Sequence, residues 1–286
     1  MSTAWVVARH TFTECTRRKI FVIVPIVTAG FLALFALGAH YAFQSVSGTV
    51  RTGPAQLVDE TSLAGSTLVG LSMFVTLFLG ASLGIFLTFG VVRGDAETGV
   101  LQQLVVRPVA RSGLLAGRFL GASFLCSTYV AVLYLACVTV VGLIGEWWPT
   151  SVVLPGLSLV SGVIVVIALS LLGSVFLSAL PNGIVVFMLY GAGLFAGLLV
   201  QLGEGLRSPS VETTGRIVSW ALPFEALYQS GLNSLTSSAT GLTRVVVQLG
   251  PLGGAQEAGP GLVLWTLVYL AGVGALALFV FNRKDL

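Results

Sequence analysis

The chain has 286 residues, of which 56% are hydrophobic and only 9% are charged, and its net charge at pH 7 is +3. Soluble domains carry about 25% charged residues, so this chain has too few charges to cover a water-facing surface. The composition excludes a soluble enzyme, a disordered protein and a coiled coil, and it predicts a polytopic membrane protein. The small net charge gives no reason to expect a nucleic-acid partner.

Residues 2–18 alternate apolar and basic side chains ahead of the first long apolar run. The pattern predicts a short helix in the cytoplasmic membrane interface, with Trp5 as its anchor and its basic residues among the lipid headgroups. The residues that carry this prediction are Trp5, Arg9, Phe12, Arg17 and Arg18. An ordinary basic flank without a fixed helix is the alternative.

Six apolar runs are long enough to cross a bilayer, which takes about 20 residues in a helix. They lie at approximately 20–43, 63–92, 113–144, 152–180, 183–202 and 259–281, with a short turn at Pro181 and Asn182 between the fourth and fifth. We therefore predict an all-α integral membrane protein with a single transmembrane domain over residues 1–286. The centres of the runs hold no Asp, Glu, Lys or Arg, which favours an external energy source over coupling to an ion gradient.

The basic residues set the orientation of these spans. With both termini in the cytoplasm, the internal segments hold ten Lys and Arg residues and the external segments hold four. This orientation makes the segment 93–118 cytoplasmic and the long segment 203–260 external.

The cytoplasmic segment predicts an amphipathic helix at about 96–106. Asp95 and Glu97 stand at its N-terminal end, where an N-cap and a negative charge are favourable. One face is apolar and is formed by Val100, Leu101, Leu104 and Val105. Arg107 precedes Pro108, which should end the helix. The apolar face needs a cover, and either the membrane surface or a groove on a partner protein would provide one.

Pairs of glycines four residues apart occur along the runs, among them Gly80 with Gly84 and Gly193 with Gly197. Such pairs let helices approach closely in lipid. They indicate either ordinary packing within the chain or a packed gate or subunit interface.

The external segment is too polar to form a seventh span. Trp220, Phe224 and Tyr228 follow one another at intervals of four residues and would share one face of a helix. Pro223 and Glu225 would make a bilayer crossing costly at this point. We expect one or two short helices over about 213–236 that dip into the outer leaflet and return, with a surface helix as the alternative.

No catalytic, cofactor or metal site is expected in this chain. A phosphate-binding loop needs glycines followed by Lys and Ser or Thr, and neither Lys19 nor Lys284 lies in such a loop. The two histidines, His10 and His40, are far apart in the sequence and have no neighbouring ligand motif.

The segment that leads into the third span resembles the signature region of the ABC type-2 exporter permeases. The family pattern is an acidic residue, a Gly-Thr-Leu step, a leucine-rich turn, Pro-Val-x-Arg, and a Gly-Lys-Phe-x-Gly start to the next span. The matching residues are Glu97, Gly99, Leu101, Leu104, Pro108, Val109, Arg111, Gly117, Phe119 and Gly121. Val100 stands in place of the usual Thr, and Arg118 replaces the usual Lys but keeps its charge.

The resemblance implies the membrane subunit of an ATP-binding-cassette exporter in a bacterial or archaeal plasma membrane. It implies two permease copies and two copies of a separate ATPase, which would bind ATP and Mg²⁺ and dock on the helix at 96–106. In such permeases the external helices close the outer end of the pathway. The apolar spans favour a hydrophobic or amphipathic substrate. A membrane sensor or assembly subunit that docks an ATPase without transporting anything is the alternative.

Overall fold

The computed structural model describes residues 20–46, 49–51, 57–88, 111–236 and 259–283. The described helices are α2 (Ile20–Gln44), α3 (Glu60–Thr88), α6 (Arg111–Gly145), α7 (Val153–Phe176), α8 (Ala179–Gly205), α9 (Pro209–Ala221), α10 (Pro223–Thr236) and α12 (Pro260–Arg283). Two short strands, β1 (Thr49–Arg51) and β2 (Leu57–Asp59), form an antiparallel ladder in which Val50 faces Val58. Apart from this ladder the described regular structure is helical, as the sequence predicts.

Within the described residues, six helices are long and apolar enough to cross a membrane: α2, α3, α6, α7, α8 and α12. The predicted number of spans is confirmed. The turn between the fourth and fifth spans is displaced from its predicted position, because α7 ends at Phe176 and α8 already begins at Ala179. Pro181 is therefore in the first turn of α8, where a residue without an N–H is readily tolerated.

Prolines mark several helix starts. Pro209, Pro223 and Pro260 are the first residues of α9, α10 and α12. The fixed backbone angle of proline suits this position, and its missing N–H would have no partner inside the helix.

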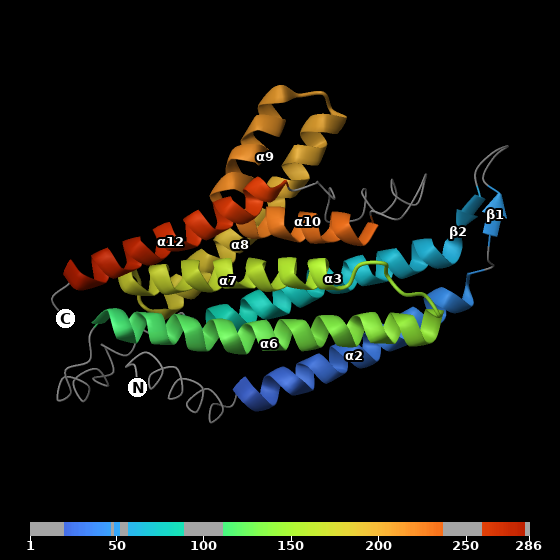
Figure 1. Cartoon of the computed structure of the whole chain (residues 1–286), viewed down its shortest axis with the longest axis horizontal. Coiled ribbons are helices and arrows are strands. Elements are labelled where there is room, and N and C mark those ends of the chain that lie inside the picture. The colour runs from blue at the N-terminus through green and yellow to red at the C-terminus, as the bar shows by residue number, and fades with distance from the viewer. Residues whose placement is uncertain (1–19, 47–48, 52–56, 89–110, 237–258, 284–286) are drawn as a thin grey trace.

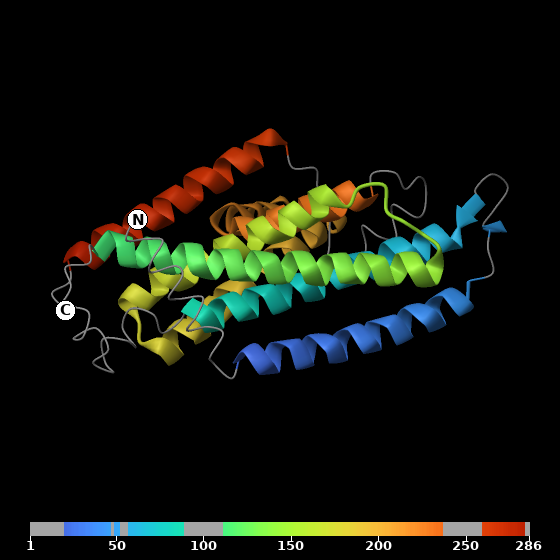
Figure 2. The same cartoon turned by 60° about the horizontal axis from the view of Figure 1, so that its bottom comes forward.

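The helices α2, α3, α6, α7 and α12 run roughly along one axis, with α2 and α6 opposite in direction to α3, α7 and α12, whereas α8 rises obliquely from the bundle (Figure 1 and Figure 2). At one end of the bundle α3, α7 and α12 end and α6 begins. We call this the Phe176 end. At the other end α2 and α6 end and α3 and α7 begin. We call this the Gly145 end.

α7 lies at the centre of the bundle. In α3 and α7, 61% of the most apolar stretch is buried, against 11% in α2 and α12, so the last two are peripheral. The core side chains of α7 include Val163 and Ile167. Two glycines of α3 let it approach its neighbours closely: Gly80 faces Val130 of α6 and Val163, and Gly84 faces Ile167. This glycine pair therefore serves packing within the chain.

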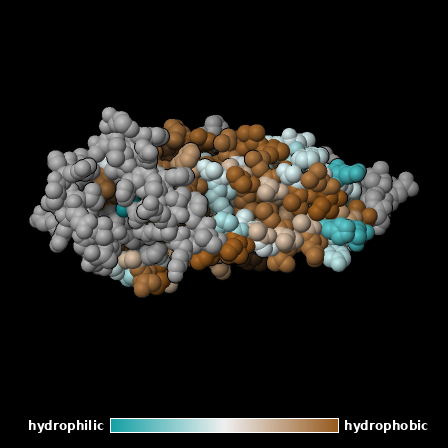
Figure 3. Space-filling model, turned by 90° about the horizontal axis from the view of Figure 1, so that it is seen from below, coloured by the Kyte–Doolittle hydropathy of each residue, from teal (hydrophilic) through white to brown (hydrophobic). Residues whose placement is uncertain are grey.

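The outer surface of the bundle is apolar. Leu34 and Leu143 are each 73% exposed, and Phe124 is 66% exposed. Figure 3 shows hydrophobic residues over much of the described part of one face, with hydrophilic residues gathered toward the Gly145 end. An exposed apolar surface of this extent is typical of a protein whose solvent is lipid.

Candidate functional site: the external helices and an apolar recess

The structure tests only part of the predicted functional residues. The interfacial helix at 2–18 and the amphipathic helix at 96–106, together with Asp95, Arg107 and Pro108, lie outside the described residues. Arg111 is the first residue of α6. The external set, Trp220, Pro223, Phe224, Glu225 and Tyr228, lies in α9 and α10 and is fully described.

The external segment forms two helices rather than one continuous helix. Leu222 has φ −128° and ψ 74°, and its N–H donates a hydrogen bond to the carbonyl of Val218 at the end of α9. Pro223 then begins α10. The prediction that Trp220, Phe224 and Tyr228 share one helical face is therefore wrong, because Pro223 has no N–H with which to continue α9.

α9 packs antiparallel against the last turns of α8, and together they form a hairpin that projects from the bundle (Figure 1). Glycine permits the close approach. A Cβ on Gly215 of α9 would lie 2.8 Å from the backbone nitrogen of Val200. On the exposed side, Arg216 pairs with Glu212 at 2.7 Å. An exposed pair of this kind contributes little to stability.

Trp220 points away from the rest of its predicted set. Its side chain is 55% exposed, and its ring meets that of Trp265 of α12 edge-on, with 5.6 Å between the centroids. The Nε1–H of Trp265 donates a hydrogen bond of 3.0 Å to the Trp220 carbonyl. Trp220 therefore joins α9 to α12 on the surface and does not line the interior.

The first turn of α10 is inserted between α7 and α8. Phe224 is completely buried, and its ring lies against Gly193 of α8. A Cβ on Gly162 of α7 would lie 3.4 Å from the Phe224 carbonyl oxygen. Two small residues on neighbouring spans thus make the space that Phe224 fills.

Glu225 is also completely buried. Its Oε1 accepts a hydrogen bond of 3.2 Å from Nε2 of Gln229, one turn further along α10. Its Oε2 is buried without a hydrogen-bond partner among the described residues. Burial raises the pKa of Glu225 to about 8, and the hydrogen bond from Gln229 opposes this only in part. The carboxyl is therefore mostly neutral at pH 7.

Aromatic rings surround this first turn of α10. The Phe224 ring stacks on Tyr190 of α8 with 5.3 Å between the centroids, and Tyr190 lies 6.2 Å from Phe78 of α3. Tyr228 meets Phe74 of α3 edge-on at 6.5 Å. Burial and the neighbouring Glu225 carboxylate both raise the pKa of Tyr228. Aromatic rings thus hold α10 to α3 and α8, whereas the polar pair of Glu225 and Gln229 lies within α10 itself.

Sequence reasoning missed several members of this cluster: Phe74, Phe78, Tyr190 and Gln229. The spacing of Glu225 and Gln229, four residues apart, could have indicated their hydrogen bond on a helix. The Gly193 and Gly197 pair is visible in the sequence, but the helix that fills its groove cannot be read from it. Nothing in the local sequence links Tyr190 to Phe224.

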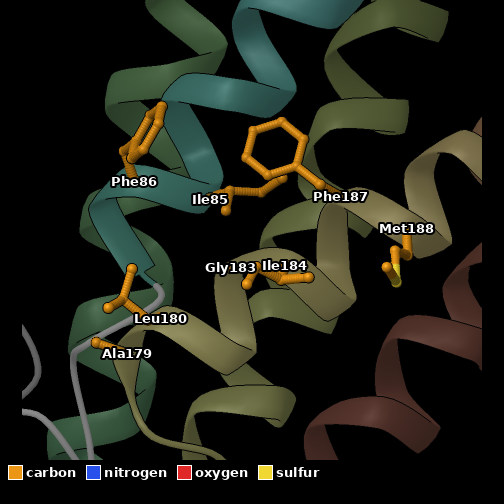
Figure 4. Close-up of a pocket in the computed structure, with 8 residues that line it drawn as sticks. All are labelled: Ile85, Phe86, Ala179, Leu180, Gly183, Ile184, Phe187 and Met188. Atoms are coloured by element: carbon orange, nitrogen blue, oxygen red, sulfur yellow. The ribbon is translucent and has the colours of Figure 1, made fainter.

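A second feature lies near the Phe176 end of the bundle. An apolar cavity of about 460 Å³ opens between the end of α3 and the start of α8. Figure 4 shows its wall, to which α3 contributes Ile85 and Phe86, and α8 contributes Leu180, Ile184, Phe187 and Met188. We call this cavity the apolar recess. Its lining suits an acyl chain or another hydrophobic group.

Polar contacts hold the three helices together at this end. The hydroxyls of Thr88 in α3 and Ser170 in α7 form a hydrogen bond of 2.8 Å. Nδ2 of Asn182, buried in α8, donates a hydrogen bond of 2.9 Å to the Ser170 carbonyl. In an apolar surrounding such interhelical bonds fix the relative positions of the spans.

Among the described residues, no group of three or more His, Cys, Asp or Glu side chains is placed to hold a metal ion. A family model described as "ABC-2 family transporter protein" matches residues 5–286, which is nearly the whole chain. A comparison with curated proteins found no match.

Proposed function

Because the chain belongs to the ABC-2 family of transporter proteins, it is a transmembrane permease subunit of an ABC transporter, and we propose that it exports a hydrophobic or amphipathic substrate. Membership of this family implies pairing with an ABC ATPase. The permease function is supported by the family match over residues 5–286 and by the six apolar helices. The permease is a transport component and not itself a catalytic subunit.

The proposed assembly has two permease copies and two copies of the ATPase, with the Phe176 end and both termini in the cytoplasm. The ATPase binds ATP and Mg²⁺ and docks on the helix at 96–106. The described ends of α3 and α6, at Thr88 and Arg111, support this position because both lie at the Phe176 end, where α7 and α8 also turn.

The choice of a hydrophobic or amphipathic substrate is supported by the apolar recess at the same end. The described spanning helices carry their charged side chains near their ends, so a strongly polar solute would find few partners between them. Closure of the ATPases would shift α3 and α6 through the segment between them, and α10 would close the opposite side.

The proposal is tested with the tagged chain, the ATPase that co-purifies with it, and proteoliposomes. We expect ATP-dependent movement of a fluorescent short-chain lipid or a lipophilic dye between the leaflets or out of the membrane. The chain freed of the ATPase should show no ATP hydrolysis.

A complex that hydrolyses ATP but moves none of a panel of hydrophobic and amphipathic probes would favour a sensor or assembly subunit. Recovery of the chain with no ATPase at all, under mild extraction, would count against the coupled mechanism.

A further inference from the structure

The carboxyl of Glu225 is a buried polar group whose hydrogen-bonding capacity is only partly used among the described residues. It is fully buried, one of its oxygens accepts only the Gln229 bond of 3.2 Å, and the other has no partner among the described residues. Burying a carboxyl group costs free energy, in the neutral form as well as in the charged form, unless hydrogen bonds or an opposite charge compensate it. Glu225 therefore does not stabilise the arrangement in which α10 is packed against α8, and we look for a role of its carboxyl in another arrangement.

The surroundings of Glu225 are aromatic. Tyr190 stacks on Phe224, the residue before Glu225, and Tyr228 follows Glu225 by three residues on α10. The hydroxyl of Tyr190 is likewise buried without a hydrogen-bond partner among the described residues. A carboxylate among aromatic rings is a combination that attracts organic ammonium ions, through charge pairing and through cation–π contact with a ring face that becomes accessible.

We propose that Glu225, together with Tyr190 and Tyr228, recognises the cationic head of an amphipathic substrate, an alkylammonium or arylammonium ion, as it leaves the permease. This inference rests on the proposed transport function and names its substrate class. In the closed arrangement the aromatic side chains fill the site. When α10 separates from α8, the carboxyl faces the pathway, the cation pairs with its oxygens, and the proton of the neutral carboxyl passes to water.

The groove on α8 makes this separation possible. The contact surface of α8 includes Gly193 against Phe224, Gly197 against Glu225, and the ring of Tyr190 on Phe224. A Cβ on Gly197 would fall 2.6 Å from Oε1 of Glu225. The two glycines offer no interlocking side chains, but the ring stack of Tyr190 on Phe224 must break as α10 moves away from α8. The Gly193 and Gly197 pair then serves as one wall of the proposed site.

Other ligands fit less well. An anion would meet a carboxylate and no basic side chain among the described residues of this cluster. A divalent metal would require more ligands than the described residues bring together. The titratable groups that face Glu225 are Tyr190 on α8 and Tyr228 on α10 itself. α7 has no titratable side chain, the only one on α3 is Glu60 in its first turn, and Glu212 and Arg216 of α9 pair with each other. α12 contributes Tyr269, whose ring lies beside that of Trp265.

The test measures binding of radiolabelled dodecyltrimethylammonium to the permease and its ATPase in lipid nanodiscs, with empty nanodiscs subtracted. The comparison ligand is the uncharged analogue in which a tert-butyl group replaces the trimethylammonium head. We expect the cation to bind at least tenfold more tightly than this analogue at pH 8.5. Glu225→Gln should abolish the difference, whereas Glu212→Gln, a change of an acid on the neighbouring α9, should leave it intact.

Because the carboxyl must lose its proton to pair with the cation, affinity should rise about tenfold per pH unit below pH 8 and level off above it. This profile tests the proposal on the wild-type complex, even if Glu225→Gln cannot be purified. Equal binding of the cation and its uncharged analogue, or wild-type binding by a folded Glu225→Gln complex, would refute the proposal. ATP-driven transport of uncharged amphiphiles without cation binding would also refute it, yet would leave the proposed transport function standing.

Discussion

Gly193 shows how a single hydrogen atom in place of a side chain determines the position of α10. The Phe224 ring lies directly over this residue, in the place that a Cβ would occupy. Two residues earlier on the same helix, a Cβ on Gly191 would have nothing within 4 Å. The two glycines are chemically identical, so any difference between their substitutions reports the α8–α10 contact.

We expect Gly193→Ala to destabilise the folded permease by about 1–3 kcal/mol, because an added methyl group in a filled contact forces the Phe224 ring to move. Gly191→Ala should be neutral or slightly stabilising, since alanine favours a helix over glycine. Thermal unfolding of both variants in the same detergent measures the difference. Similar unfolding temperatures for the two variants would show that Phe224 does not lie tightly on Gly193.

The external segment shows how a short helix acquires its place. α9 is mostly exposed and carries an ion pair on its surface, whereas α10, which follows after a single residue, is buried in the bundle. The break at Pro223 reorients the chain, so that residues four apart across it no longer share a face. The helix predicted at 96–106 should behave like a docking element, since the apolar stripe that the sequence predicts for it needs a cover.

Replacing both Leu101 and Leu104 with Asp should abolish binding of the ATPase. Each leucine side chain contributes about 1.5–3 kcal/mol if fully covered, and charges placed against an apolar groove add a further penalty. The total of several kcal/mol is enough to dissociate a micromolar complex. Co-purification of the tagged permease with its ATPase measures the effect.

Gln102→Ala with Gln103→Ala is the matched control, because these two side chains lie off the apolar stripe and should matter much less. A stably inserted Leu101→Asp, Leu104→Asp permease that retains its ATPase at wild-type levels would mean that this helix lies on the lipid surface instead. That outcome would remove the docking assignment and leave the family membership untouched.

At the scale of the whole molecule, six apolar helices and a bias of ten basic residues against four predict that both termini lie in the cytoplasm. The two ends of the bundle can be distinguished by exposed residues. Ser112 lies in the first turn of α6 at the Phe176 end, and Thr150 lies between α6 and α7 at the Gly145 end, and both are exposed. Cys126 and Cys137 are buried and should react slowly with a polar reagent.

In a Cys15→Ser background, a membrane-impermeant maleimide added to intact cells should label Thr150→Cys and not Ser112→Cys. Opening the cells should make Ser112→Cys reactive. Labelling of Ser112→Cys in intact cells, with Thr150→Cys protected, would invert the proposed orientation and move the ATPase-docking segment to the wrong side of the membrane.

Much of the fold can be predicted from the sequence because a bilayer imposes it. A helix needs about 20 apolar residues to cross, so run length alone predicts the six spans. The exact positions of the turns depend on small differences in free energy between local packing and hydrogen-bonding arrangements. The sequence predicts a turn at Pro181, but the first turn of α8 accommodates this residue, and Asn182 beside it bonds back to Ser170.

The sequence by itself determined the membrane class, the number of spans and the polar break between the fifth and sixth, because these follow from hydropathy along the chain. Only the tertiary structure decided which residues meet. Phe224 lies on Gly193 and Tyr190, and Glu225 loses all contact with solvent, because α10 folds back between α7 and α8. Trp220, four residues before Phe224, is turned to the surface instead. Burial is a property of neighbours distant in sequence, and no local pattern records it.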